Sequence, residues 1–321
     1  MSSRPVLLTS LLALIVLASP AAEPKTVRLL TIGNSFSANA TRYLNDLAKA
    51  GGHILIHQPL VLPGASFQDQ VTKAKKHEAN PKNKAGLYAC GLGLKEALTK
   101  VKWDYVTIQQ ASIKSADFRT YQPHAGWLRD YIFKHAPQAK LLVHQTWAYR
   151  VDDPRFLRPS GKEGEPQSHV QMYRDLMSAY DQIAAELGGT VIPVGDAFYA
   201  VDTDENWRFK HDTVFDFKTA TAPKLPDQRN SLHVGWQWKK QKSGKLTLSM
   251  DGHHANGAGE YLGGCVWYEV LFGQSAVGNR FVPEGMTPEY ARFLQDTAHR
   301  AVQSRAKRPK VETPHSRSSP P

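Results

Sequence analysis

Short apolar runs alternate with helical segments along most of the chain, and this alternation constrains the fold more than any other feature. The runs are nearly continuous in apolar residues, which is typical of strands that are covered on both faces. They lie at residues 27–32, 54–64, 104–112, 139–149 and 190–198, and the helical segments lie at 38–50, 66–76, 121–135, 168–187 and 256–273. This series predicts an α/β fold in which a five-stranded parallel sheet lies between two layers of helices.

The first 22 residues have the pattern of a secretory signal peptide. Arg4 precedes the 13-residue run VLLTSLLALIVLA, and residues 19–22 are small residues suited to cleavage. A membrane anchor is the alternative, but the run is too short to cross about 30 Å of hydrocarbon as a helix. We therefore expect an exported protein, periplasmic or extracellular, with no stable membrane insertion after cleavage.

The rest of the chain is predicted to form one domain over residues 23–305, with an insertion at 202–250. The insertion mixes charges with aromatic residues, which either form a small core of their own or stack on sugar rings. Its last part, KKQKSGKLTLSM, contains a Ser-Gly pair typical of a hairpin turn. Residues 306–321 are basic and rich in Pro and Ser, which predicts a disordered tail.

The formal net charge of +11 raises the question of nucleic-acid binding. The basic residues are spread over the chain and are densest in the tail, and no nucleic-acid-binding module is recognisable. We therefore expect no nucleic-acid partner, because an acidic polysaccharide or wall polymer suits such a surface better. The two cysteines, Cys90 and Cys265, either form the disulfide that export would permit or remain buried thiols.

The candidate reactive residue is Ser35, which follows the first strand in the segment IGNSFS. A serine at this place either caps the next helix or acts as a nucleophile, and a nucleophilic serine needs a base that a carboxylate orients. The segment DGHH offers this pair in a loop before the last helix, since a tight turn can bring Asp251 against His254. His253 is the competing base.

Donors for a developing oxyanion can come from the same edge of the sheet, where the carboxyl ends of parallel strands bind ligands. Gly64 ends the second predicted strand, where a glycine leaves its backbone N–H uncovered. Gln109 and Gln110 end the third strand and carry side-chain amides.

Four segments in this order carry a family resemblance: IGNSFS, LPGAS, DYVTIQQAS and DGHHAN resemble the motif blocks of the SGNH hydrolases, the GDSL-type esterases and lipases. The likeness extends over roughly residues 27–273, and GNSFS, IQQAS, HQTWAY and DGHH are similar to a bacterial branch described as a domain of unknown function. It implies a flavodoxin-like α/β/α fold and the hydrolysis of esters, often acetyl groups on carbohydrates, without a cofactor. It also implies Ser35 as nucleophile, His254 as base and Asp251 as its orienting acid, with the backbone N–H groups of Ser35 and Gly64 as oxyanion donors.

Two blocks depart from the family pattern. Asn34 stands before the serine, where the family usually has an acidic residue that performs no proton transfer. The third block lacks the family's asparagine, and we expect Gln110 to replace it as an oxyanion donor, with Gln109 and Ser112 as rivals.

Two aromatic residues at the end of the fourth predicted strand, Trp147 and Tyr149, are predicted to contact the substrate, and a role in the core is the alternative. A metal hydrolase is an alternative, because Asp251 and two adjacent histidines lie together, with His233 not far away in sequence. Adjacent histidines in a tight turn rarely face one ion, and no HExxH segment or cysteine cluster is present. We therefore expect no metal.

These features together predict an exported serine esterase that acts on a small-molecule or polysaccharide ester. The alternatives are a non-catalytic glycan-binding protein on the same scaffold and an acyltransferase that passes the acyl group to a sugar hydroxyl.

Overall fold

The computed structural model describes residues 23–157 and 165–308. The predicted signal peptide at 1–22 and residues 309–321 of the predicted tail lie outside the described residues. None of the helices within the described ranges combines the length and the apolarity that crossing a bilayer requires.

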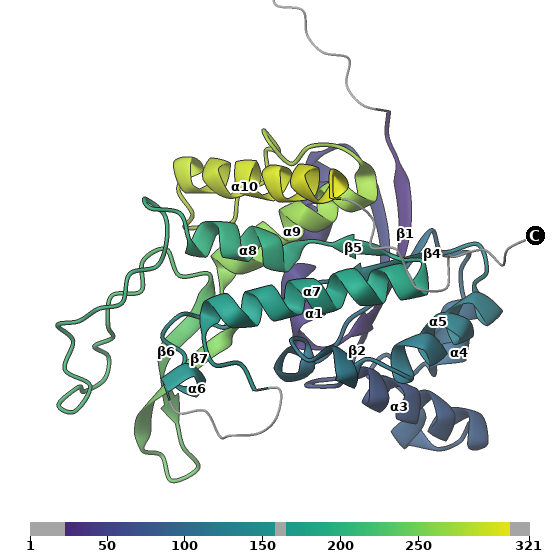
Figure 1. Ribbon diagram of the computed structural model, residues 1–321, viewed down its shortest axis with the longest axis horizontal. Coiled ribbons are helices and arrows are strands. Elements are labelled where there is room, and N and C mark those ends of the chain that lie inside the picture. Colours follow the sequence, from purple (N-terminus) through teal and green to yellow (C-terminus); the bar gives the residue numbers. More distant parts are fainter. Residues whose placement is uncertain (1–22, 158–164, 309–321) are drawn as a thin grey trace, which may run out of the picture.

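The centre of the protein is a sheet of five parallel strands, as the sequence predicts (Figure 1). The strands are β1 (Thr26–Gly33), β2 (Ile54–Val61), β3 (Tyr105–Ile108), β4 (Lys140–His144) and β5 (Thr190–Ile192). Their spatial order is β2-β1-β3-β4-β5, which is the flavodoxin-like order. The strand order reverses between β1 and β3, so the crevice beyond the carboxyl ends of these two strands is the expected ligand site.

Helices cover both faces of the sheet. Right-handed crossovers place the helices between β1 and β2 on one face and those that follow β2 on the other. On the first face, α1 (Ser35–Ala40) and α2 (Leu44–Ala50) pack against α9 (Gly257–Phe272). On the second, α5 (His124–His135) packs against α3 (Phe67–Ala79), α4 (Leu94–Thr99) and α7 (His169–Leu187).

Outside these layers, α8 (Val194–Asp202) and α10 (Pro288–Ala306) pack against each other and against α9, and short helical segments fill the connections. These short segments are η1 (Lys84–Gly86), η2 (Ser112–Lys114), η3 (Phe118–Thr120) and α6 (Pro154–Leu157).

The insertion ends in an antiparallel hairpin of β6 (His233–Lys240) and β7 (Leu246–Ala255). Gly244 lies in its turn with φ +83°, which confirms the predicted Ser-Gly turn. Figure 1 shows the hairpin at one end of the molecule, away from α3, α4 and α5. The segment Asp251–Ala255 belongs to β7, so the prediction of a loop at DGHH is wrong: the strand runs to the N-cap of α9, Asn256.

Three further differences have local causes. The helix predicted at 38–50 is two helices, because the Thr41 hydroxyl donates back to the carbonyl of Ser37 and a turn follows. The run 190–198 is a short strand and then α8, because Pro193 fixes φ and has no N–H for a ladder. Both cysteines are free, with Cys90 exposed and Cys265 buried, so they form no disulfide.

Candidate active site

Ser35 is the first residue of α1 at the carboxyl end of β1, and it is not the cap of that helix. The cap is Asn34, whose Oδ1 accepts the backbone N–H of Phe36 at 2.9 Å. The first N–H groups of a helix have no partner within the helix, and the N–H of Ser35 has no acceptor among the described residues. The sequence therefore places a half-buried serine, with a free backbone donor, at the switch point of the sheet.

The turn that contains Gly64 lies beside this serine. The side-chain amide of Asn34 donates to the carbonyl of Ala65 at 3.0 Å, and the N–H of Leu62 donates to the carbonyl of Gly33 at 3.0 Å. Gly64 has φ +67°, is exposed, and its N–H has no acceptor among the described residues. Asn34 thus holds the two backbone donors predicted for the oxyanion, Ser35 and Gly64, on neighbouring loops.

Near its end, β7 carries a histidine that contacts Ser35 and a carboxylate that contacts this histidine. His254 Nε2 lies 2.9 Å from Ser35 Oγ, and His254 Nδ1 lies 3.0 Å from Asp251 Oδ2. Asp251 Oδ1 also accepts the backbone N–H of His254 at 3.1 Å. The imidazole is therefore fixed by a carboxylate on one nitrogen and faces the serine hydroxyl with the other, the arrangement that makes a serine a nucleophile.

The charge state of Asp251 follows from its neighbours. Partial burial acts to raise the pKa of this carboxyl, but hydrogen bonds from the ring and backbone of His254 outweigh it, helped by the charge that His253 can carry. The net result is a pKa well below the ordinary value for aspartate. Asp251 is therefore ionised throughout the neutral range and faces His254 Nδ1 as a carboxylate.

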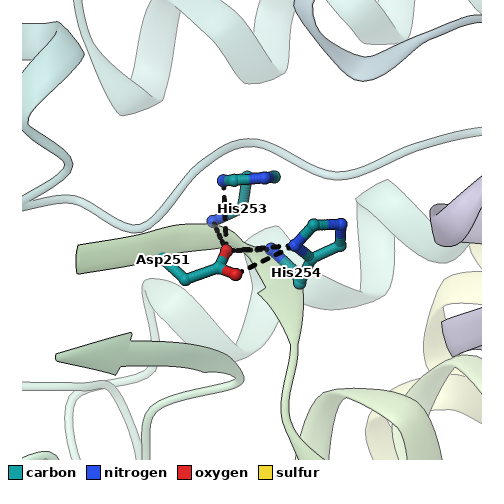
Figure 2. Close-up of side chains that lie close together, drawn as sticks. All are labelled: Asp251, His253 and His254. Atoms are coloured by element: carbon teal, nitrogen blue, oxygen red, sulfur yellow. Dashed lines mark hydrogen bonds and ion pairs between the residues drawn. The ribbon is translucent and has the colours of Figure 1, made fainter. Parts of the chain in front are cut away.

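His253 also points to the carboxylate of Asp251, as Figure 2 shows. Its Nδ1 lies 3.1 Å from Asp251 Oδ1 and 3.1 Å from Arg155 Nη2. Burial lowers the pKa of His253 to about 4, although the charge of Asp251 opposes this. Of the two competing bases, the geometry thus brings His254 to Ser35.

Asp251, His253 and His254 also form the cluster in which a metal would find ligands, since one ligand atom from each lies within 4.8 Å of the others. Both ring nitrogens of His254 are occupied by Ser35 and Asp251 in this arrangement. The cluster is therefore already used as a hydrogen-bonded array around the serine. His233 is not a member of this cluster, and its Nε2 lies 3.0 Å from the carbonyl oxygen of Ala148.

The structure corrects the prediction that Gln110 supplies an oxyanion donor. Gln110 is fully buried, and its amide nitrogen donates to the carbonyl and hydroxyl of Thr120 at 2.9 and 3.1 Å. Its Oε1 accepts the N–H groups of Phe67 and Ala111 at 3.1 and 2.9 Å. Both amide protons are thus used, and the side chain instead holds the start of α3, which follows the Gly64 turn.

The two rivals for that role are also engaged. The Oε1 of Gln109 accepts the Ser37 hydroxyl at 2.8 Å and the Asn34 N–H at 3.3 Å, and its amide nitrogen donates to the carbonyl of Gln110. The Ser112 hydroxyl pairs with the Tyr149 hydroxyl at 3.0 Å. Gln109 therefore supports the turn that carries Ser35 through its hydrogen bonds to Asn34 and Ser37.

Trp147 and Tyr149 do not lie on the surface of the site, which corrects the prediction of substrate contact. The indole of Trp147 is fully buried and stacked between Phe36 and Phe198, with centroids 4.4 and 4.5 Å away. Tyr149 is 1% exposed, and the Arg155 guanidinium covers its ring at 4.4 Å. Both residues pack against His253 of β7 in the interior, so they have the alternative role in the core.

A residue that the sequence analysis missed, Arg150, fastens the insertion to the end of β4. Its side chain is 1% exposed, pairs with Asp152 at 2.6 Å and donates to Gln228 at 2.8 Å. Its backbone N–H donates to the carbonyl of Gly252 at 2.7 Å, beside Asp251. The available signal was an arginine directly after the predicted strand that ends in HQTWAY, because this position predicts a buried side chain and a buried charge must be paired.

Comparisons with known proteins agree with this fold. The family model of the domain of unknown function DUF4886 matches residues 28–205, and no curated protein matches the chain. The crystal structure of a DUF4886 family protein from Bacteroides uniformis is 25% identical, with a TM-score of 0.65 over 89% of this chain and 98% of that one.

Two further structures are more distant. A proposed SGNH hydrolase from Slackia heliotrinireducens is 23% identical, with a TM-score of 0.45 over 76% of this chain and 98% of that one. A proposed GDSL-like lipase from Parabacteroides merdae is 10% identical, with a TM-score of 0.43 over 80% and 100%. These two likenesses say nothing of activity at such scores. The family model, by contrast, covers more than half of the chain and includes Ser35 and Gly64, so the chain belongs to the DUF4886 family.

Proposed function

We propose that the protein is an exported serine esterase of the SGNH type. The observation that carries the proposal is the continuous contact from Asp251 through His254 to Ser35, with 3.0 and 2.9 Å between the paired atoms. A serine hydroxyl is a weak nucleophile by itself, and a base at hydrogen-bond distance removes this limit. A protein that only bound glycans would not need the three groups in this order.

In the acylation step, Ser35 Oγ attacks the ester carbonyl while its proton passes to His254 Nε2. The carboxylate of Asp251 stabilises the resulting imidazolium and keeps Nε2 directed at the serine. The negative charge on the former carbonyl oxygen is held by the N–H groups of Ser35 and Gly64. When the tetrahedral intermediate collapses, the C–O bond of the ester breaks and His254 returns the proton to the leaving alcohol.

In the second step, water takes the place of that alcohol. His254 accepts one proton of the water, the hydroxide adds to the acyl carbon, and Ser35 leaves with the proton from His254. The products are a carboxylic acid and the free serine. An acyltransferase would differ only here, because a sugar hydroxyl would take the place of water.

The acyl group is proposed to be acetyl and its carrier a carbohydrate, as the family resemblance of the four motif blocks implies. The N-terminal sequence pattern supports an exported location.

The proposal is tested by acetate release from an aryl acetate and from acetylated polysaccharides. Ser35→Ala is expected to lose about 10³-fold or more of the turnover with the thermal unfolding midpoint unchanged. Ser304→Ala, which changes an exposed serine on α10, is the matched control and should match the parent. Near-full activity of Ser35→Ala would refute the assignment, and acyl transfer to an added sugar in preference to water would favour the acyltransferase.

A further inference from the structure

The tip of the β6–β7 hairpin carries an unbalanced positive charge. Four exposed lysines lie within seven residues, and no acidic residue occurs between Asp227 and Asp251. The lysines form no ion pair with a described residue, and they are Lys239, Lys240, Lys242 and Lys245. Within a Debye length of about 8–10 Å such charges act together on an approaching anion.

The lysine-rich surface around α3 and α4 is different, because acidic residues are interspersed there. Glu78 and Glu96 lie among its lysines, and Glu96 pairs with His77 at 3.5 Å. The hairpin tip is therefore distinguished by missing counter-charges and not by the number of its lysines alone.

The two faces of the hairpin differ in what covers them. On one face, Trp236 contacts Phe217 with ring centroids 4.8 Å apart, and the indole N–H of Trp238 donates to the carbonyl of Lys224 at 2.9 Å. This apolar face is therefore occupied by the insertion's own residues. The sequence allowed a small core or stacking on sugar rings for the aromatic residues of the insertion, and these two tryptophans belong to a small core.

The other face is polar. Gln237 lies opposite Ser249, and Lys239 lies opposite Thr247, so these side chains alternate with the tryptophans. Gln237 and Ser249 are half-buried, and their side chains have no hydrogen-bond partner among the described residues. Such side chains offer donors and acceptors to the hydroxyl groups of a polymer.

The strand β7 connects these lysines to the residues that face Ser35. β7 begins next to the tip and contains Asp251 and His254 near its end. The six residue steps from Lys245 to Asp251 correspond to about 20 Å of extended strand. A polymer that lies along the hairpin can therefore contact the tip while one of its ester groups reaches Ser35.

We propose that the β6–β7 hairpin docks an anionic polysaccharide, so that the esters cleaved at Ser35 are carried by a polymer of uronic acids. This inference rests on the proposed esterase function for the ester but not for the docking. The lysines supply the attraction for a carboxylate on each sugar, and the polar face supplies partners for the hydroxyl groups. Uronic-acid polymers combine a regular negative charge with acylated hydroxyl groups, which a nucleic acid does not offer to an esterase.

The test compares two full-length variants that lose the same charge. The hairpin variant changes the four tip lysines to glutamine, and the control variant changes four exposed lysines of the opposite end, Lys82, Lys84, Lys95 and Lys100, to glutamine. For acetylated polygalacturonate we expect the hairpin variant to raise KM about tenfold or more at low salt, and the control to change it little. The kcat/KM for an aryl acetate and for neutral acetylated glucomannan should be unchanged in both variants.

A binding measurement separates docking from chemistry. The Ser35→Ala protein should be retarded in a gel that contains polygalacturonate, the retardation should disappear in high salt, and the hairpin substitutions should abolish it. Equal effects of both lysine variants, or a hairpin variant that binds and hydrolyses the polymer like the parent, would overturn the docking proposal. Retardation by DNA through the hairpin, without retardation by the polysaccharide, would overturn it too.

The outcomes distinguish the two proposals. If the parent hydrolyses the aryl acetate and the hairpin variant behaves like the parent on every polymer, the esterase proposal stands and the docking proposal is refuted. If the parent hydrolyses no ester but binds polygalacturonate through the hairpin, the docking proposal stands and the esterase proposal is refuted.

Discussion

The indole N–H of Trp147 donates to the carbonyl oxygen of His253 at 2.9 Å. This bond joins the segment after β4 to the residue before His254, and the same indole stacks on Phe36, the residue after Ser35. Trp147 therefore contacts both sides of the reactive pair without reaching the surface. Its position makes it a brace between the segments that carry Ser35 and His254.

Replacing Trp147 with Phe should weaken this brace while it keeps part of the stacking. The His253 carbonyl loses its partner, and an unsatisfied buried group costs about 1–3 kcal/mol. We expect a lower free energy of unfolding and a lower kcat, with KM for an aryl acetate nearly unchanged. Urea unfolding and steady-state kinetics measure both, and Trp127→Phe on the half-buried surface of α5 is the control. A raised KM with an unchanged kcat would instead indicate substrate contact.

Asp251→Asn should lower kcat by about 10²- to 10⁴-fold, because an amide neither orients the imidazole correctly nor stabilises its charge. The low pKa of this carboxyl has a second consequence. In the parent, activity should not fall through protonation of Asp251 anywhere above pH 4, since the carboxylate keeps its charge there. Asp216→Asn, an exposed carboxylate in the insertion, should leave the pH–rate profile unchanged. An Asp251→Asn enzyme with parental kcat would remove Asp251 from the mechanism.

Gln109→Leu should displace Ser35, because it removes hydrogen bonds that hold the turn around this residue. The substitution leaves the Ser37 hydroxyl and the Asn34 N–H without their acceptor. We expect slower labelling of Ser35 by a fluorophosphonate and a lower kcat, together with a stability loss of about 1–3 kcal/mol. Gln68→Leu, an exposed glutamine on α3, should change neither the labelling rate nor the kcat. Unchanged labelling in Gln109→Leu would show that the turn holds its shape without this amide.

The stability of the protein should fall in mild acid because of buried histidines. Burial lowers the pKa of His144 to about 3, while an unfolded histidine titrates near 6.5. Between these values the unfolded state binds a proton that the folded state does not, so the free energy of unfolding decreases as the pH falls. His144 alone contributes a slope of about 1.4 kcal/mol per pH unit in this window.

The measurement for His144 is urea unfolding at pH 6.5 and pH 4.5. His144→Gln should reduce the difference between the two free energies, even if the variant is less stable at both pH values. His211→Gln, which changes an exposed histidine, should leave the difference as it is in the parent. An equal pH dependence in the parent and in His144→Gln would show that other groups cause it.

The series of strands along the chain and the candidate residues Ser35, Asp251 and His254 could be selected from local patterns in the sequence. Apolar runs mark the buried strands, and Ser35, Asp251 and His254 stand out as polar residues at the ends of predicted elements. The helix α10 was open to prediction as well, since Thr287 and Pro288 form a cap and first turn typical of a helix start.

The roles of Gln110, Trp147 and Tyr149 could not be predicted in the same way. Each is polar or amphipathic and follows a strand, which suits a binding site and a buried brace equally well. The difference depends on Thr120, Phe198 and Arg155, which reach them from other parts of the fold. The loop predicted at DGHH failed for a related reason, because its strand pairing with β6 is a contact that the local sequence does not show.

The separation of Ser35 from His254 has a consequence for the making of the protein. The two residues are 219 positions apart, and the base arrives on a hairpin outside the central sheet. A chain that is still being synthesised therefore contains Ser35 long before His254 has been added. The contact between the two side chains can form only when nearly the whole domain has been made and the hairpin has closed onto the sheet, so the proposed nucleophile gains its proposed base only at that stage.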